Sequence, residues 1–108
     1  MQLRTEIWVA GYVRRVEVGG AFATVAARGD RDAGAVIVKV CLLDGRAKVF
    51  VQALGPDGET VWMRPLGAES GATEGEVDAY IERRRSRDRD LWVVEVEDRR
   101  GRSFLDDV

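Results

Sequence analysis

Pairs of acidic residues are the part of this sequence whose types and spacing are best suited to chemistry. Asp30 and Asp32 share a turn-like segment, and Glu95 and Glu97 stand about 7 Å apart on one side of a predicted strand. Carboxylates so spaced could share a Mg²⁺ ion or act as an acid and a base. They are equally typical of a turn and of the solvent face of an amphipathic strand, and we favour that structural interpretation.

A nuclease-like metal site would also need a lysine close to these acids on a neighbouring strand. Lys39 follows Ile37 and Lys48 follows Arg46 at the two-residue offset, which is not the required pattern. We therefore expect no lysine beside the acids. A carboxylate-dependent Mg²⁺ enzyme is kept as the second alternative function.

Other catalytic chemistry has little to work with. The chain has no histidine, which is the commonest general base near neutral pH and the commonest metal ligand. Cys41 lies in a predicted strand without an adjacent base, so we expect a small packed residue rather than a nucleophile. A phosphate-binding glycine loop followed by lysine does not occur. We expect no catalytic residue, metal ligand or cofactor and favour a non-enzymatic protein, leaving the question open.

The densest charge lies in residues 82–90, which contain five arginines and three acids and so carry a local charge of +2. Arg83 and Arg87 lie on one helical side and could contact a phosphate backbone or an acidic partner. Arg84 is expected to pair with Asp88 at the i, i+4 spacing. A solvated, salt-bridged helix end is favoured, and nucleic-acid binding through Arg83, Arg84 and Arg87 is the first alternative function.

Length and composition set the class of protein. A chain of 108 residues with 45% hydrophobic content fits a single domain over residues 1–108 with one core. The net charge of −2 argues against a protein that binds polyanions over its whole surface. Apolar runs are too short to span a membrane, and no signal peptide is recognised, so a cytoplasmic protein without membrane contact is expected.

The N-terminal segment is ambiguous between helix and strand. Its β-branched residues over 7–18 favour a strand, whereas Val9, Tyr12, Val13 and Val16 follow helical spacing and Gly19-Gly20 suits a helix end. We favour the helix.

Strands are predicted next over 21–28, 34–43, 46–54 and 59–66, with Arg28-Gly29-Asp30 as the entry to a hairpin. Asp44-Gly45 predicts a two-residue type I′ turn in which Leu43 faces Arg46. The ladder then pairs apolar residues on one face: Leu42 with Ala47, Val40 with Val49, Val38 with Val51 and Val36 with Ala53. The other face is mixed, so partial cover is expected there too.

Later elements are clearer. Residues 67–72 are predicted as a loop, and Thr73 with Glu76 forms a capping box that begins a helix. Residues 91–97 are predicted as a strand with Trp92 in the core, and 102–105 as a short strand. Trp62 lies opposite its strand neighbours near a sheet edge, which makes it the best candidate for a partner surface, although a core position is slightly favoured.

Several motifs resemble a known family. They are Thr5-Glu6-Ile7-Trp8, Gly20-Ala21-Phe22-Ala23, Arg28-Gly29-Asp30, Ala33-Gly34-Ala35-Val36, Val38-Lys39-Val40 and, above all, Asp90-Leu91-Trp92-Val93-Val94-Glu95-Val96-Glu97-Asp98-Arg99. Together they are similar to a family of short bacterial proteins, domain of unknown function 1491. The resemblance covers nearly the whole chain and implies a single bacterial domain, but it carries no functional residue.

The sequence thus predicts one α+β domain with a mostly antiparallel sheet of five to six strands and a helix on each face. The favoured function is a small non-enzymatic interaction module that binds a protein partner or associates with itself. Arg83, Arg84, Arg87 and Trp62 are its candidate partner-binding residues. Nucleic acid is the less favoured partner.

Overall fold

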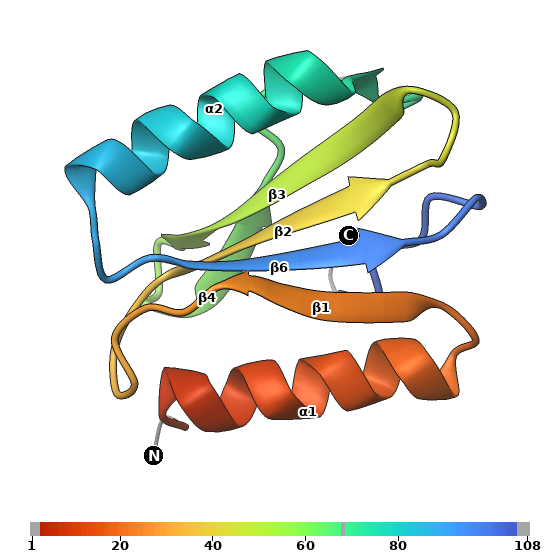
Figure 1. The fold of residues 1–108 in the computed structure, drawn as a ribbon. Helices are drawn as coiled ribbons and strands as arrows, with labels where there is room; N and C mark the ends of the chain where they lie inside the picture. Colours follow the sequence, from red (N-terminus) through yellow and green to blue (C-terminus); the bar gives the residue numbers. More distant parts are fainter. Residues whose placement is uncertain (1–2, 68, 106–108) are drawn as a thin grey trace.

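A central β-sheet separates two helices, with one helix on each of its faces (Figure 1). The computed structural model describes residues 3–67 and 69–105. The helices are α1 (Thr5–Val18) and α2 (Glu74–Arg87). The strands are β1 (Phe22–Ala27), β2 (Val36–Cys41), β3 (Arg46–Leu54), β4 (Thr60–Met63), β5 (Ala72–Thr73) and β6 (Trp92–Glu97).

The sheet has the order β1-β6-β2-β3-β4, and β5 pairs with the start of β3. Among the described strands, β2 and β6 form a parallel pair and the other neighbouring pairs are antiparallel. The predicted α+β fold, with a mostly antiparallel sheet and a helix on each face, is confirmed. Neither described helix is long and apolar enough to cross a membrane.

Residues 5–18 are helical, as favoured from the sequence. α1 buries Val9, Tyr12 and Val16 against the sheet, which accounts for their helical spacing despite the β-branched content. The chain leaves the helix through Gly20, whose φ of 91° suits glycine. Tertiary burial has therefore overridden the local preference of valine and isoleucine for strands.

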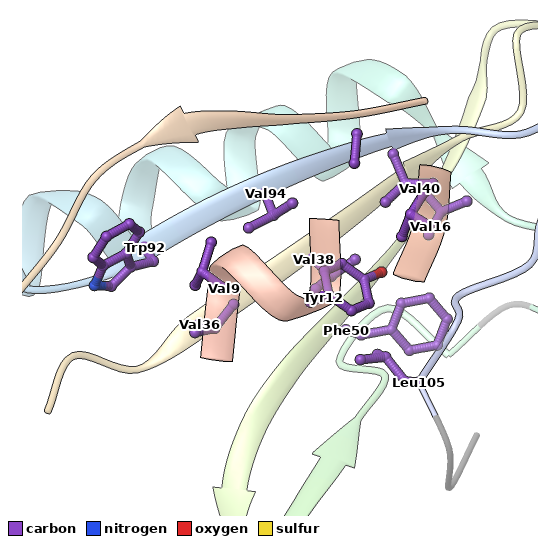
Figure 2. Close-up of a cluster of buried hydrophobic side chains, with 12 residues drawn as sticks. Val9, Tyr12, Val16, Val36, Val38, Val40, Phe50, Trp92, Val94 and Leu105 are labelled. Carbon is purple, nitrogen blue, oxygen red and sulfur yellow. The ribbon is translucent and has the colours of Figure 1, made fainter. Parts of the chain in front are cut away.

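The core has two parts because β2 is buried on both faces. Figure 2 shows the α1 side, where Tyr12 lies among valines of β2 and β6 with Phe50 nearby. Trp92 is 1% exposed and belongs to this cluster, which confirms its predicted core position. The α2 side is built from Ile37, Ala47, Val49, Val51, Val77, Ile81, Leu91 and Val93.

The predicted hairpin register between residues 36–43 and 46–53 is wrong by one residue. Val38 pairs with Phe50 and Val40 with Lys48, so the predicted all-apolar pairs do not form. The burial argument failed because helices cover both faces of β2, so either register buries apolar side chains. The turn is also longer than predicted, since Leu42 N donates to Arg46 O at 3.0 Å and encloses a three-residue loop.

The segment that begins at Arg28-Gly29-Asp30 does not lead into a hairpin, because β6 lies between β1 and β2. The loop closes on the chain just before β6, where Asp30 N donates to Asp90 O at 3.0 Å. A Cβ atom on Gly29 or Gly34 would stand 2.1 Å from that same carbonyl oxygen. Glycine is thus required by a close backbone approach at both positions.

The predicted capping box is present at the start of α2. Glu76 N donates to the Thr73 hydroxyl at 3.2 Å, and that hydroxyl lies 2.9 Å from the Glu76 carboxylate. The predicted Arg84–Asp88 ion pair is wrong. Arg84 Nη1 donates instead to Tyr80 Oη at 2.9 Å, because the half-buried Tyr80 offers an acceptor one turn earlier.

Two smaller predictions about strands are also wrong. Residues 102–105 form no strand but pass beneath α1, where Tyr12 Oη donates to the Ser103 carbonyl. Part of the predicted loop 67–72, of which Ala68 lies outside the described residues, forms β5 through Ala72. β5 is only two residues long and carries no periodic signal of its own, since it exists by pairing with β3.

Candidate functional site

The sheet opens into a fork between β2 and β3. Their last pair is Ile37 with Val51, yet β3 continues to Leu54 in company with β4. At the mouth of the fork, Val36 N donates to the side-chain oxygen of Gln52 at 2.8 Å. The side chain of Gln52 therefore takes the place that a backbone carbonyl would hold in a continued ladder.

This splitting leaves strand backbone without a strand partner. Gly55 N donates to Glu59 O at 2.7 Å, which makes that pair a hydrogen-bonded one. Because such pairs alternate along an antiparallel ladder, Gln52 and Leu54 direct their backbone N–H and C=O groups away from β4 and toward the fork. Leu54 thus presents a donor and an acceptor there, with its side chain 78% exposed.

A cavity of about 750 Å³ occupies this fork, and we call it the fork groove. Its walls are the first turn of α1, the residues that precede β2, the end of β3, and Trp62 of β4. Trp8 and Trp62 meet with ring centres 5.5 Å apart, and Trp8 stacks on Tyr12 at 5.1 Å. Leu3, which is 62% exposed, extends the apolar rim.

Trp62 combines features of the core position and of the surface position that were considered for it. It is half-buried, packs against the α1-side core and also lines the fork groove, while β4 forms the edge of the sheet as expected. Its role as a partner-binding residue stays a prediction. The sequence did not reveal Trp8 as its neighbour, since the two tryptophans are more than 50 positions apart in the chain.

The charged residues of the fork groove have partners within the protein. Arg4 Nε lies 3.7 Å from a carboxylate oxygen of Asp32, and Arg15 Nη1 donates to Phe104 O at 3.2 Å. Thr5 Oγ1 donates to Gly34 O at 2.8 Å. The groove is therefore suited to an uncharged, partly apolar ligand.

A buried lysine forms the second site-like cluster of the molecule. Lys39 is 4% exposed, and its Nζ lies 2.6 Å from a carboxylate oxygen of Asp78 and 3.0 Å from one of Glu74. Burial by itself lowers the pKa of the ammonium, but the two hydrogen bonds to carboxylates outweigh burial and raise that pKa above its ordinary value. Lys39 is thus a permanent cation that ties β2 to α2, and it cannot serve as a base.

The prediction that no lysine lies beside the acids is wrong, because Lys39 is the register partner of Glu95 on β6. Cys41 stands near the same cluster, with its sulfur 3.8 Å from a Glu95 oxygen and 3.9 Å from a Glu74 oxygen. Burial raises the pKa of the Cys41 thiol to about 11, although Lys39 opposes that shift. Cys41 is buried, as predicted for a packed residue, and its thiol is protonated at neutral pH.

The four carboxylates considered for a Mg²⁺ site do not converge. Asp30 caps its own loop by accepting from Asp32 N and Ala33 N at 3.2 and 2.8 Å. Glu95 faces Lys39, whereas Glu97 is exposed and pairs with Phe22 at the sheet edge. Within residues 3–67 and 69–105, His, Cys, Asp and Glu form no group of three that could hold a metal ion.

The three candidate arginines lie along one part of α2 without forming a shared site. The guanidinium carbons of Arg83 and Arg84 each lie 6.0 Å from the centre of the Tyr80 ring. Arg87 is exposed in the last turn of the helix. None of the three lines the cavity beside α2, whose arginines are Arg28, Arg85 and Arg89.

Lys39 is the feature that sequence reasoning should have found. It stands in the middle of Val-Ile-Val-Lys-Val-Cys, a strand that is otherwise apolar. A charge in such a strand requires buried compensation, and Glu74 with Asp78 are spaced i, i+4 on the predicted helix. The fork groove had no such signal, because it arises where two strands stop pairing.

Comparison with known proteins gives consistent results. Residues 3–106 match the model of a family described as protein of unknown function (DUF1491). The crystal structure of a DUF1491 family protein from Caulobacter crescentus CB15 has 51% sequence identity and a TM-score of 0.88, and the match covers 98% of this chain and 97% of that chain. No curated protein matches.

Two solution structures are also similar to the chain. An NMR structure of a DUF1491 family protein from Caulobacter crescentus CB15 has 53% identity and a TM-score of 0.84, with 99% of this chain and 96% of that chain covered. The solution structure of protein Atu0922 from A. tumefaciens has 34% identity and a TM-score of 0.82, with 100% and 96% covered. The resemblance seen in the sequence is confirmed, and the chain belongs to the DUF1491 family, a family of unknown function.

Proposed function

We propose that this protein is a non-enzymatic interaction module that binds an extended, largely apolar peptide segment of a partner protein in the fork groove. The single observation that carries the proposal is that one cavity contains both β3 backbone without a strand partner and a wall of aromatic side chains. Peptides that add to a sheet bind through main-chain hydrogen bonds and gain specificity from pockets for alternate side chains. The groove offers both kinds of contact.

Backbone pairing would use the fork-facing N–H and C=O groups of Leu54. A peptide strand entering the fork can accept from and donate to Leu54, as a continued β2 would have done. The Gln52 side chain already uses its oxygen for Val36 N, and its amide nitrogen supplies a further donor.

Side-chain recognition would rest on Trp62 and Trp8. Both are half-buried and their rings are already in contact, so a ligand can cover the remaining ring surface with little loss of side-chain freedom. The charges of Arg4 and Asp32 compensate one another, which favours an uncharged residue at that end of the peptide.

The test begins with a displayed library of random peptides selected on the protein, followed by calorimetric titration of synthetic peptides from the selection. We expect apolar consensus residues and at least about tenfold weaker binding by Trp62→Ala. Leu54→Pro removes the N–H that faces the fork and should weaken binding to a similar degree.

Phe22→Ala is the matched control, because Phe22 is an exposed aromatic residue on the opposite edge strand, 58% exposed. It should leave the affinity unchanged. Failure to select any peptide, or equal weakening by Trp62→Ala and Phe22→Ala, would contradict the proposal. Each variant must first show the same cooperative thermal unfolding as the parent protein.

A further inference from the structure

A second cavity lies on the α2 side of the sheet, and it collects arginines. It has a volume of about 730 Å³, and we call it the arginine hollow. Arg85 comes from the last turn of α2, Arg89 from the turn that follows, and Arg28 from the position after β1. Ile81 and Leu91, both buried, supply apolar surface to the same cavity.

Two of these guanidinium groups are uncompensated. Within the described part of the chain, neither Arg85 nor Arg89 forms an ion pair or a hydrogen bond through its side chain. Both side chains are exposed, and so their charges are available to a ligand.

Arg28 is held in place from both sides. Its guanidinium carbon lies 5.0 Å from the centre of the Trp92 ring, and one Nη atom lies 3.4 Å from a Glu6 oxygen. The Trp92 ring is itself fixed, since its indole N–H donates to Asp30 O at 2.7 Å. The guanidinium of Arg28 is therefore already engaged by Glu6 and Trp92, and the ligand charge must be met by Arg85 and Arg89.

The acidic residues of the hollow reduce its charge without cancelling it. Asp78 and Glu82 also line it, and Arg28 is paired with Glu6, so Arg85 and Arg89 are the cations left to be balanced. Asp78 accepts from the buried Lys39 ammonium at 2.6 Å, which neutralises its charge locally. An excess of positive charge therefore remains around Arg85 and Arg89.

We propose that the arginine hollow binds the phosphate group of a small phosphorylated molecule. Guanidinium groups recognise phosphate through paired hydrogen bonds, and the uncompensated Arg85 and Arg89 line the same cavity. The volume falls within the range of small-molecule pockets, and Ile81 with Leu91 can contact an apolar part of the ligand. A long polyanion is a poorer fit, because Glu82 and a net chain charge of −2 would repel it.

The test is a ¹H–¹⁵N NMR titration of the full chain with inorganic phosphate and, separately, with phenyl phosphate. We expect saturable shifts of the arginine Nε–H signals of Arg85 and Arg89. Phenyl phosphate should bind more tightly than inorganic phosphate, because its ring can contact the apolar side of the hollow.

Paired variants of equal charge give the matched control. The double variant Arg85→Ala with Arg89→Ala should weaken phenyl phosphate binding at least about tenfold, which is a loss easily resolved by titration. Arg83→Ala with Arg87→Ala removes the same charge from the same end of α2 but lies outside the hollow, and it should change the affinity less than about twofold.

Equal weakening by the two double variants would overturn the proposal and indicate general electrostatic attraction. Absence of saturable shifts with both probes would overturn it as well. The proposal would also be overturned if a single-stranded oligonucleotide bound more tightly than phenyl phosphate and did so through Arg83 and Arg87. That result would indicate that the arginines of α2 bind nucleic acid. Peptide binding in the fork groove should be unaffected by the Arg85→Ala and Arg89→Ala changes, which keeps the two proposals separable.

Discussion

Removing the two carboxylates that hold Lys39 should destabilise the domain, although both belong to a surface helix. The perturbation is the double variant Glu74→Gln with Asp78→Asn, which preserves side-chain shape and deletes both negative charges. Lys39 would then stay beneath α2 as a buried cation that has lost both hydrogen-bonded carboxylates, with Glu95 as the remaining acid that faces it. A buried charge that has lost its partner is strongly destabilising, even where the intact pair adds little.

The size of the effect follows from burial and geometry. Hydrogen bonds to charged groups contribute about 1.5–3 kcal/mol each when both partners are buried. Here the Lys39 side chain is 5% exposed, but those of Glu74 and Asp78 are 46% and 57% exposed. Solvent screening therefore reduces each contact to about 1 kcal/mol, and the double variant should lose about 2 kcal/mol in total.

Urea denaturation at pH 7, followed by far-UV circular dichroism, would measure this loss, and thermal unfolding should show a Tm lowered by about 10 °C. Lys39→Met supplies the decisive comparison. It replaces the cation with an apolar side chain of similar length, and the two exposed carboxylates can then be hydrated, so its own cost should stay below about 1 kcal/mol. In the Lys39→Met background, the Glu74→Gln and Asp78→Asn changes should cost almost nothing.

Glu82→Gln is the matched control on the same helix. Glu82 is exposed and forms no ion pair within the described part of the chain, so its loss should change stability by less than about 0.5 kcal/mol. The reasoning is refuted if the double variant is as stable as the parent protein. It is also refuted if the double variant costs the same with Met at position 39 as with Lys.

Three further outcomes follow from other features of the fold. Leu43 has a φ of 63° and a side chain 47% exposed, so Leu43→Asn should raise the unfolding free energy by about 0.5–1 kcal/mol in urea titrations, and a loss would contradict the strain. Hydrogen bonds from Arg102 lower the pKa of the buried Asp98 carboxyl below its ordinary 3.8, so the stability it contributes is present above pH 3.8 and is lost as the pH falls through the lowered value. Asp98→Asn should therefore be less stable at pH 7 and show a weaker loss on acidification, whereas an unchanged acid profile would exclude this role. The buried Cys41 thiol, with its pKa raised to about 11, should react with a thiol reagent at pH 8 only as fast as the protein opens, and labelling at the rate of a free thiol would show otherwise.

Elements with their own local signal were predicted well. The bounds of β3, Arg46–Leu54, agree with the predicted residues 46–54, because Asp44-Gly45 and Gly55-Pro56 mark both ends. The capping box at Thr73 placed the start of α2 within a residue. Local backbone chemistry therefore carried these predictions.

Features that depend on distant parts of the chain were missed. The hairpin register was wrong because β2 is buried on both faces, so the burial of apolar side chains could not choose between registers that differ by one residue. The ion pairs of Lys39 with α2 and the insertion of β6 between β1 and β2 were missed as well, because both join distant parts of the chain. Arg84 contacts Tyr80 instead of the predicted Asp88, because the position of the half-buried Tyr80 hydroxyl is set by packing that the sequence does not show.

The strand order has a consequence for how this protein folds during synthesis. β1 is made early, yet its sheet partner is β6, about 70 residues later in the chain. β2 likewise gains its second neighbour only when β6 arrives. Pairing strands so far apart closes a long loop, and the chain loses conformational entropy before the stabilising contacts form. We therefore expect folding to be slow and all-or-none. A nascent chain that ends before Trp92 lacks the strand that joins β1 to β2, and it leaves the edges of both strands exposed to the cell's chaperones and proteases.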